Sequence, residues 1–147
     1  MNKENLKQLS QFTGSEQFFG FPPFLILSEG VRFLIENADC YWLLNIIGSY
    51  QPDCRKDRML RDMQFWTIRK NKQPEKYPPF TLGAVLNSKQ KRVPYATVVC
   101  ERDTGNVAFT QDVNSTDFPF DVLGDEFKIW VGYGGEKRMT AYLPSEH

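Results

Sequence analysis

The chain has 147 residues, of which 41% are hydrophobic, 24% charged and 14% aromatic, and this composition predicts one globular domain, residues 1–147, with a sizeable core. Eighteen Lys and Arg balance eighteen Asp and Glu, so no overall charge directs the molecule to nucleic acid or to a membrane surface. The three cysteines form no C-x-x-C pair, which argues against a disulfide framework or a zinc ribbon and favours a reducing, cytoplasmic location.

The first apolar run, FFGFPPFLIL at residues 18–27, is interrupted by two prolines. It makes a poor signal peptide, and it is too short and too interrupted for a membrane-spanning helix. We therefore expect no membrane association.

Two amphipathic helices are expected next. Ser28 suits a helix start, and apolar residues recur at helical spacing from Val31 to Ala38. Asp39 can cap a second helix that is apolar almost all round. This helix should end near residue 50, because Pro52 disfavours helical geometry in the residue before it.

From Met63 onward the residues favour strands. The turn sequences DTGN and GGE follow the second and fourth of these strands, so their neighbours should pair antiparallel. The expected fold is α+β, with the N-terminal helices packed on one face of an antiparallel sheet of about four to five strands. The candidate strands are residues 65–70, 95–102, 107–113, 127–133 and 138–143.

Residues 70–94 interrupt the strand pattern with four prolines and many lysines. Loops of this length are uncommon inside compact domains and are usually functional or mobile. We expect a surface excursion in this segment.

The balanced charge hides a strong segregation along the chain. Residues 53–92 hold eleven Lys or Arg and four Asp or Glu, a net of +7, whereas residues 101–126 hold one Arg and seven acids, a net of −6. Cations interleaved with aromatic rings are typical of single-stranded nucleic acid binding. The candidate binding residues are Arg55, Lys56, Arg58, Arg61, Trp66 and Tyr77.

Two alternatives to nucleic acid binding stay open for the charged segments. The lysines can simply keep a surface loop solvated, with Phe65 or Trp66 facing the core. The basic and acidic segments can also attract each other, either within one molecule or across a homodimer.

Few catalytic templates fit the sequence. The only histidine, His147, is the last residue of the chain, where order is hard to guarantee, so we interpret it as a tail residue. The best remaining catalytic set is a carboxylate pair, Asp117 and Asp121, for acid and base chemistry. The sequence predicts no metal site and no cofactor.

Cys54 stands beside Arg55 and Lys56, which would favour a reactive thiolate. The preferred interpretation is a small apolar side chain that fills a turn, because free cysteines are among the most buried residue types.

Six stretches of the chain resemble an uncharacterised family of small bacterial proteins often carried on phage or other mobile elements. They are LSQFTGSEQFF, GVRFLIENADCYWLL, SYQP, RMLRDMQFWTI, TDFPFD and LPSEH. The resemblance implies no activity. It suggests that residues 55–62 hold a helix-to-sheet junction, with Asp57 and Asp62 pairing with neighbouring arginines.

These observations lead to three functional hypotheses. The first is a non-enzymatic accessory or regulatory protein of a mobile element that binds a macromolecule, with a protein partner favoured. The alternative is nucleic acid binding through residues 53–92, and the third is a carboxylate-dependent enzyme.

Overall fold

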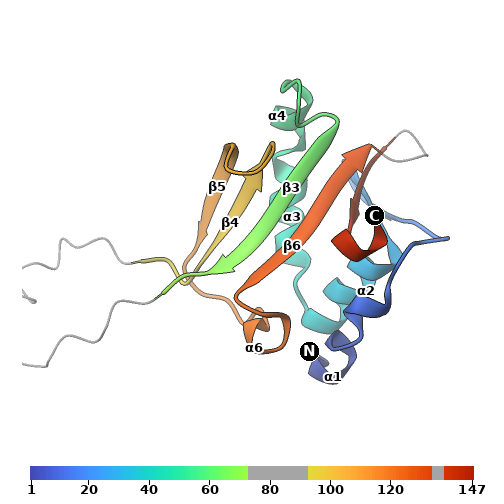
Figure 1. Cartoon of the computed structure of the whole chain (residues 1–147), viewed down its shortest axis with the longest axis vertical. Helices are drawn as coiled ribbons and strands as arrows, with labels where there is room; N and C mark the ends of the chain where they lie inside the picture. The colour runs from blue at the N-terminus through green and yellow to red at the C-terminus, as the bar shows by residue number, and fades with distance from the viewer. Residues whose placement is uncertain (73–92, 134–137) are drawn as a thin grey trace, which may run out of the picture.

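The computed structural model describes residues 1–72, 93–133 and 138–147, and within these ranges seven strands form one mixed sheet (Figure 1). The strands are β1 (Phe19–Phe21), β2 (Leu25–Leu27), β3 (Met63–Lys70), β4 (Ala96–Glu101), β5 (Val107–Val113), β6 (Glu126–Tyr133) and β7 (Met139–Tyr142). Their order across the sheet is β1-β2-β7-β6-β3-β4-β5. The β2–β7 pair is parallel and the other neighbouring pairs are antiparallel.

Helices precede and interrupt the strands. They are α1 (Lys3–Leu6), α2 (Glu29–Ala38), α3 (Tyr41–Ser49), α4 (Gln51–Arg55) and α6 (Phe120–Leu123), with 3-10 turns at Leu9–Gln11 and Pro144–Glu146. No helix within the described ranges has the length and apolar composition needed to cross a membrane.

The α+β class is confirmed, but the predicted count of about four to five strands is too low. All five candidate strands are present as β3 to β7, and the antiparallel pairing predicted for β4–β5 and β6–β7 is confirmed. The two missed strands, β1 and β2, flank the turn at Pro22 and Pro23. Each has only three residues, too few to show an alternating pattern. Because β2 pairs in parallel with β7, the sheet is mixed and not purely antiparallel.

The helix boundaries follow from local chemistry. Ser28 caps α2 as predicted, since its hydroxyl accepts a hydrogen bond from the Val31 N–H at 3.2 Å. The prediction that Asp39 begins the next helix is wrong, because Asp39 ends α2 in the left-handed conformation, with φ of 52°. Pro52 lies in the first turn of α4. Proline is tolerated there because the backbone N–H groups of the first turn have no hydrogen-bond partner within the helix.

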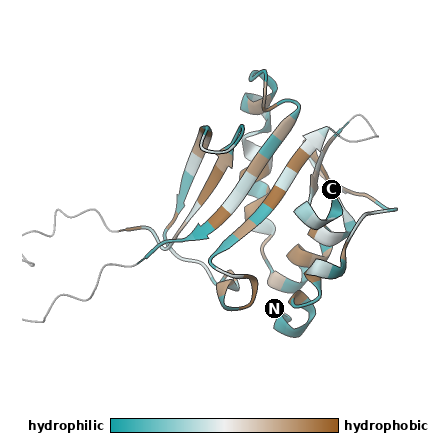
Figure 2. Cartoon of the chain, in the orientation of Figure 1, coloured by the Kyte–Doolittle hydropathy of each residue, from teal (hydrophilic) through white to brown (hydrophobic). Residues whose placement is uncertain are grey.

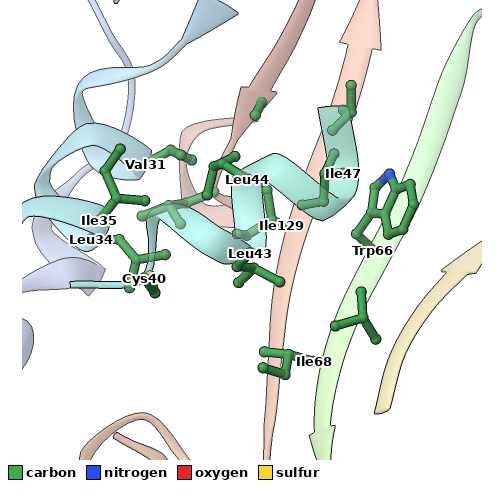
Figure 3. Packing of buried hydrophobic residues seen from close by; sticks show 14 of the residues in the cluster. Val31, Leu34, Ile35, Cys40, Leu43, Leu44, Ile47, Trp66, Ile68 and Ile129 are labelled. Carbon is green, nitrogen blue, oxygen red and sulfur yellow. The ribbon is translucent and has the colours of Figure 1, made fainter. Parts of the chain in front are cut away.

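The core lies between the sheet and helices α2 and α3. Figure 3 shows Leu43 and Ile47 of α3 among buried side chains of β3 and β6, including Ile129. Buried and partly buried residues alternate along β3, and Gln64, Trp66 and Ile68 are the buried ones. Hydrophobic and hydrophilic residues both occur along the strands of the sheet, as the colours of Figure 2 show. Of the two rings that the sequence offers for the core, Phe65 and Trp66, Trp66 is therefore the one that faces the core.

Most of the predicted excursion at 70–94 lies outside the described residues. At its ends, the Asn71 N–H donates to the Tyr95 carbonyl at 3.0 Å, so the chain leaves β3 and re-enters at the neighbouring strand β4. The basic and acidic segments touch within the molecule where Arg69 lies opposite Glu126 and the Lys70 N–H donates to the Asp125 carbonyl at 2.8 Å.

Candidate anion-binding cleft

A buried amide network fixes α4 against β3. The side chains of Gln51 and Gln64, 1% and 0% exposed, exchange two hydrogen bonds of 2.9 and 2.8 Å. The indole Nε1 of Trp66 donates to the Gln64 side-chain oxygen at 2.8 Å, and the two amide nitrogens also donate to the carbonyls of Ile47 and Leu60. Because a buried polar group is costly when unpaired, this network holds the two elements in one relative position.

Asp57 shapes the connection between α4 and β3. Its carboxylate accepts hydrogen bonds from the N–H groups of Leu60 and Met59, at 3.1 and 3.0 Å, and pairs with Arg102 at 2.8 Å. These contacts, the Leu60 hydrogen bond foremost, hold the pKa of Asp57 below its ordinary value. The predicted pairing of Asp57 with a neighbouring arginine is therefore wrong, because its partner comes from the end of β4.

A cleft of about 590 Å³, here called the arginine cleft, lies between this junction and the β1–β2 turn. Three exposed arginines line it: Arg55 from α4, Arg61 from the connection after α4, and Arg138 from the residue before β7. Figure 1 shows α4 at the end of the sheet where β3 begins and β6 ends. Three separate elements thus bring positive charge to one place.

The three guanidinium groups are free to bind a ligand, since none forms an ion pair or a hydrogen bond with another described residue. The Cζ atom of Arg55 lies 5.0 Å from the centre of the Phe24 ring, a cation–π contact that leaves its N–H groups available. Among the described lining residues, Asp62 is the one carboxylate. An electropositive cleft of this kind suits a carboxylate or a phosphate, which guanidinium groups bind in bidentate fashion.

The cleft contains two of the predicted binding residues, Arg55 and Arg61. Lys56 and Arg58 are exposed on the same connection but do not line it. The basic run that the sequence shows as one cluster is therefore divided between the cleft and the surface beside it.

Of the two rings predicted to stack on bases, Trp66 does not line the cleft. Trp66 is only 2% exposed, and its ring packs against Tyr50 with a centroid distance of 5.7 Å. A base cannot stack on a ring buried in this way, so Trp66 leaves the candidate site. Tyr77 lies outside the described residues.

Sequence reasoning missed Arg138, which is distant from the basic run along the chain. β7 pairs with β6 and β6 pairs with β3, with Tyr133 opposite Met139 and Gly132 opposite Met63. This register brings the start of β7 to the same end of the sheet as the start of β3, with the end of β6 between them. Only knowledge of the strand order would have placed Arg138 with the other two arginines.

Cys54 also lines the cleft but is 1% exposed. Burial raises the pKa of its thiol to about 12, with Asp53 and Asp57 adding to the shift. The preferred interpretation as a buried apolar side chain is confirmed. Cys40 and Cys100 are buried as well.

The carboxylate pair proposed for catalysis has no supporting environment. Asp117 and Asp121 are exposed, and neither lines the arginine cleft. Asp121 pairs with Lys3 at 2.7 Å, and this hydrogen bond lowers the pKa of Asp121. A general acid at neutral pH needs the opposite shift.

His147 is packed and is not the loose tail residue that the sequence suggests. Its Nδ1 lies 3.1 Å from the Tyr142 hydroxyl, and its ring contacts Trp130 edge-on at a centroid distance of 5.4 Å. The hydroxyls of Ser15 and Ser28 both donate to Glu146, so neither is bonded to His147. In the part of the chain that the structure describes, no group of three or more His, Cys, Asp or Glu side chains could hold a metal ion.

Comparison with protein families matches residues 3–147 to DUF6876, a family of unknown function. The chain belongs to this family. No curated protein and no solved structure matches it. Membership confirms the predicted resemblance to an uncharacterised family, and the match includes all three arginines of the cleft.

Proposed function

We propose that the protein is a non-enzymatic accessory or regulatory protein of a mobile element, acting in the cytoplasm, that binds a macromolecular partner through an anionic group of that partner. The observation that carries the proposal is the convergence of Arg55, Arg61 and Arg138, each without a described ionic partner, on one cleft. Gathering like charges costs electrostatic free energy, and a bound anion would offset that cost.

The chemistry of the described lining supports binding more than catalysis. The cleft offers positive charge and N–H donors, while its thiol is buried and the Gln51 and Gln64 amides are bonded to each other. The amide network also keeps α4 in place, so that Arg55 is held on a rigid support. A binding site gains affinity from this kind of preorganisation.

Nucleic acid is the second candidate partner. It is favoured by the net charge of +7 on residues 53–92 and by the exposed Lys56 and Arg58 beside the cleft. It is disfavoured by the burial of Trp66, which removes the one described ring proposed for stacking. A protein partner is therefore preferred.

The test compares two double charge reversals that change the net charge equally. Arg61→Glu with Arg138→Glu removes cations from the cleft, and Lys56→Glu with Arg58→Glu removes them from the surface beside it. The probes are a fluorescent oligoglutamate peptide, single- and double-stranded DNA, and single-stranded RNA, followed by anisotropy across a salt series.

The proposal predicts that the cleft variant loses oligoglutamate binding by about tenfold or more, and that the surface variant loses much less. Equal losses in both variants would show binding by overall charge alone and would overturn the proposal. Absence of binding to every probe at low salt would overturn it as well. Tight, salt-sensitive binding to nucleic acid but not to the peptide would replace it with the second candidate.

A further inference from the structure

A second hollow, of about 470 Å³, lies on the sheet face opposite the helices and is here called the apolar groove. Its floor takes one residue from each of four adjacent strands: Ile26 of β2, Thr140 of β7, Gly132 of β6 and Met63 of β3, aligned in register. A Cβ atom on Gly132 would lie 3.0 Å from the sulfur of Met63. Glycine therefore keeps the floor of the groove open.

The wall of the groove includes the C-terminal segment. The carboxylate of Glu146 accepts hydrogen bonds from the hydroxyls of Ser15 and Ser28, both at 2.6 Å, and from the Leu143 N–H at 2.9 Å. The carboxylate oxygens of Glu146 thus find their hydrogen-bond donors within the protein. The wall is held together by these bonds, and it does not require a ligand to complete it.

Exposed aromatic rings lie at the groove. Phe18 and Tyr133 both line it, and their exposed fractions are 43% and 61%. Large apolar side chains that remain exposed beside an apolar hollow often mark a binding surface. Tyr142 adds a third ring, which stacks on His147 at a centroid distance of 5.8 Å.

The groove adjoins the arginine cleft. Asp62 and Tyr133 line both, and the Tyr133 N–H donates to the Asp62 carbonyl at 3.3 Å. These two residues, here called the ridge, therefore lie where the two hollows meet, with the arginines in one hollow and the apolar surface in the other. A ligand that fills the cleft therefore reaches the groove by crossing this ridge.

We propose that cleft and groove form one bipartite site for a peptide segment of a protein partner, in which an acidic side chain stands next to a large apolar one. The acidic side chain binds the arginines, and the apolar side chain enters the groove between Phe18 and Tyr142. This inference rests on the proposed function, because it names the chemistry of the macromolecular partner.

Charge favours a peptide over a nucleic acid strand in this site. The described lining of the groove contains no Lys or Arg, whereas Asp62 stands on the ridge. A strand that placed one phosphate in the cleft would carry the next phosphates past a carboxylate and onto a surface without countercharge. A peptide places its charge only where the arginines are.

The experiment measures the anisotropy of labelled peptides that carry an acidic and a large apolar residue together, either one alone, or neither. The groove variants are Phe18→Ser, at an exposed ring, and Gly132→Val, which fills the floor. Tyr41→Ser is the control, because Tyr41 is 47% exposed and lines neither hollow. Circular dichroism checks that each variant is folded.

The bipartite peptide is expected to bind about tenfold or more tightly than either single-feature peptide. Phe18→Ser and Gly132→Val should each remove most of that gain, and Tyr41→Ser should remove none. If the apolar residue of the peptide does not change its affinity, while Arg61→Glu with Arg138→Glu still abolishes binding, the bipartite site is wrong and the anion-binding function stands. If the arginine variant binds as well as the wild type, both are wrong. Equal or tighter binding of single-stranded DNA, lost in the groove variants, would assign the site to nucleic acid instead.

Discussion

The backbone N–H of Gly30 donates to the Glu146 carboxylate at 3.3 Å, and no side chain fits between the two residues. A Cβ atom on Gly30 would lie 2.5 Å from Oε1 of Glu146 and 2.7 Å from a methyl carbon of Leu143. This contact joins the start of α2 to the C-terminal segment that walls the apolar groove.

Gly30→Ala should therefore destabilise the protein by about 1–3 kcal/mol, because overpacking displaces the C-terminal segment. Urea unfolding measures the loss. Gly14→Ala is the matched control, since a Cβ atom there meets nothing within 4 Å, and its stability should change by less than about 1 kcal/mol. A Gly30→Ala protein as stable as the wild type would show that the segment is not held by this contact.

The amide network predicts a second stability effect. Gln51→Leu removes both hydrogen bonds between the two amides, so Gln64 keeps its bonds to Trp66 and Leu60 but has one N–H donor without a partner in the core. The free energy of unfolding should therefore fall by about 1–3 kcal/mol. The exposed Gln8, changed to Leu, serves as the control for the substitution itself. If the two variants unfold at the same urea concentration, the network does not fix α4.

The hydrogen bonds that the Asp57 carboxylate accepts from the Leu60 N–H and from Arg102 make the stability of the protein depend on pH in the acid range. The pKa of Asp57 is below its ordinary value in the folded protein, so the native carboxylate stays ionised at pH values where the unfolded chain takes up a proton. Its stabilisation is complete above the unfolded-state pKa and is lost as the pH falls through the folded-state pKa.

Asp57→Asn should therefore be less stable than the wild type at neutral pH and should decline less on acidification. Chemical denaturation at a series of pH values between neutral and the acid limit of the fold measures both effects. Asp53→Asn is the control, because Asp53 is exposed on α4, just before the connection that holds Asp57, and forms no ion pair within the described residues. Parallel pH profiles for Asp57→Asn and the wild type would rule out the linkage.

The buried thiol predicts low reactivity. With a pKa of about 12 and 1% exposure, Cys54 should resist iodoacetamide in the native protein and react only after unfolding. Mass spectrometry of peptides labelled with and without denaturant tests this. Rapid native labelling of Cys54 would mean that the arginine cleft holds an accessible thiolate and would reopen a catalytic hypothesis.

Most of the sheet could be predicted from the sequence, because β3 to β7 are long enough to show β-favouring runs bounded by turns. The strands β1 and β2 could not, since each has three residues and the two prolines between them resemble a simple interruption. The short helix α4 was hidden for a similar reason: Pro52 indicates a helix end as readily as a first turn.

The candidate site could be predicted only in part. Arg55 and Arg61 were found because they lie in one basic run, and local charge is visible in a sequence. Arg138 depends on the strand order, which local patterns do not specify. The choice between Phe65 and Trp66 for the core depends on the register of β3, and a shift of one residue reverses it.

Arginine side-chain NMR can show whether the three arginines of the cleft bind one anion together. The Nε–H signals of the arginines are assigned by substitution and followed during titration with inorganic pyrophosphate and then with oligoglutamate. We expect the signals of Arg55, Arg61 and Arg138 to shift together and saturate with one dissociation constant, while those of Arg58 and Arg69 stay in place. Uniform small shifts of all arginines, or shifts confined to arginines outside the cleft, would contradict this expectation.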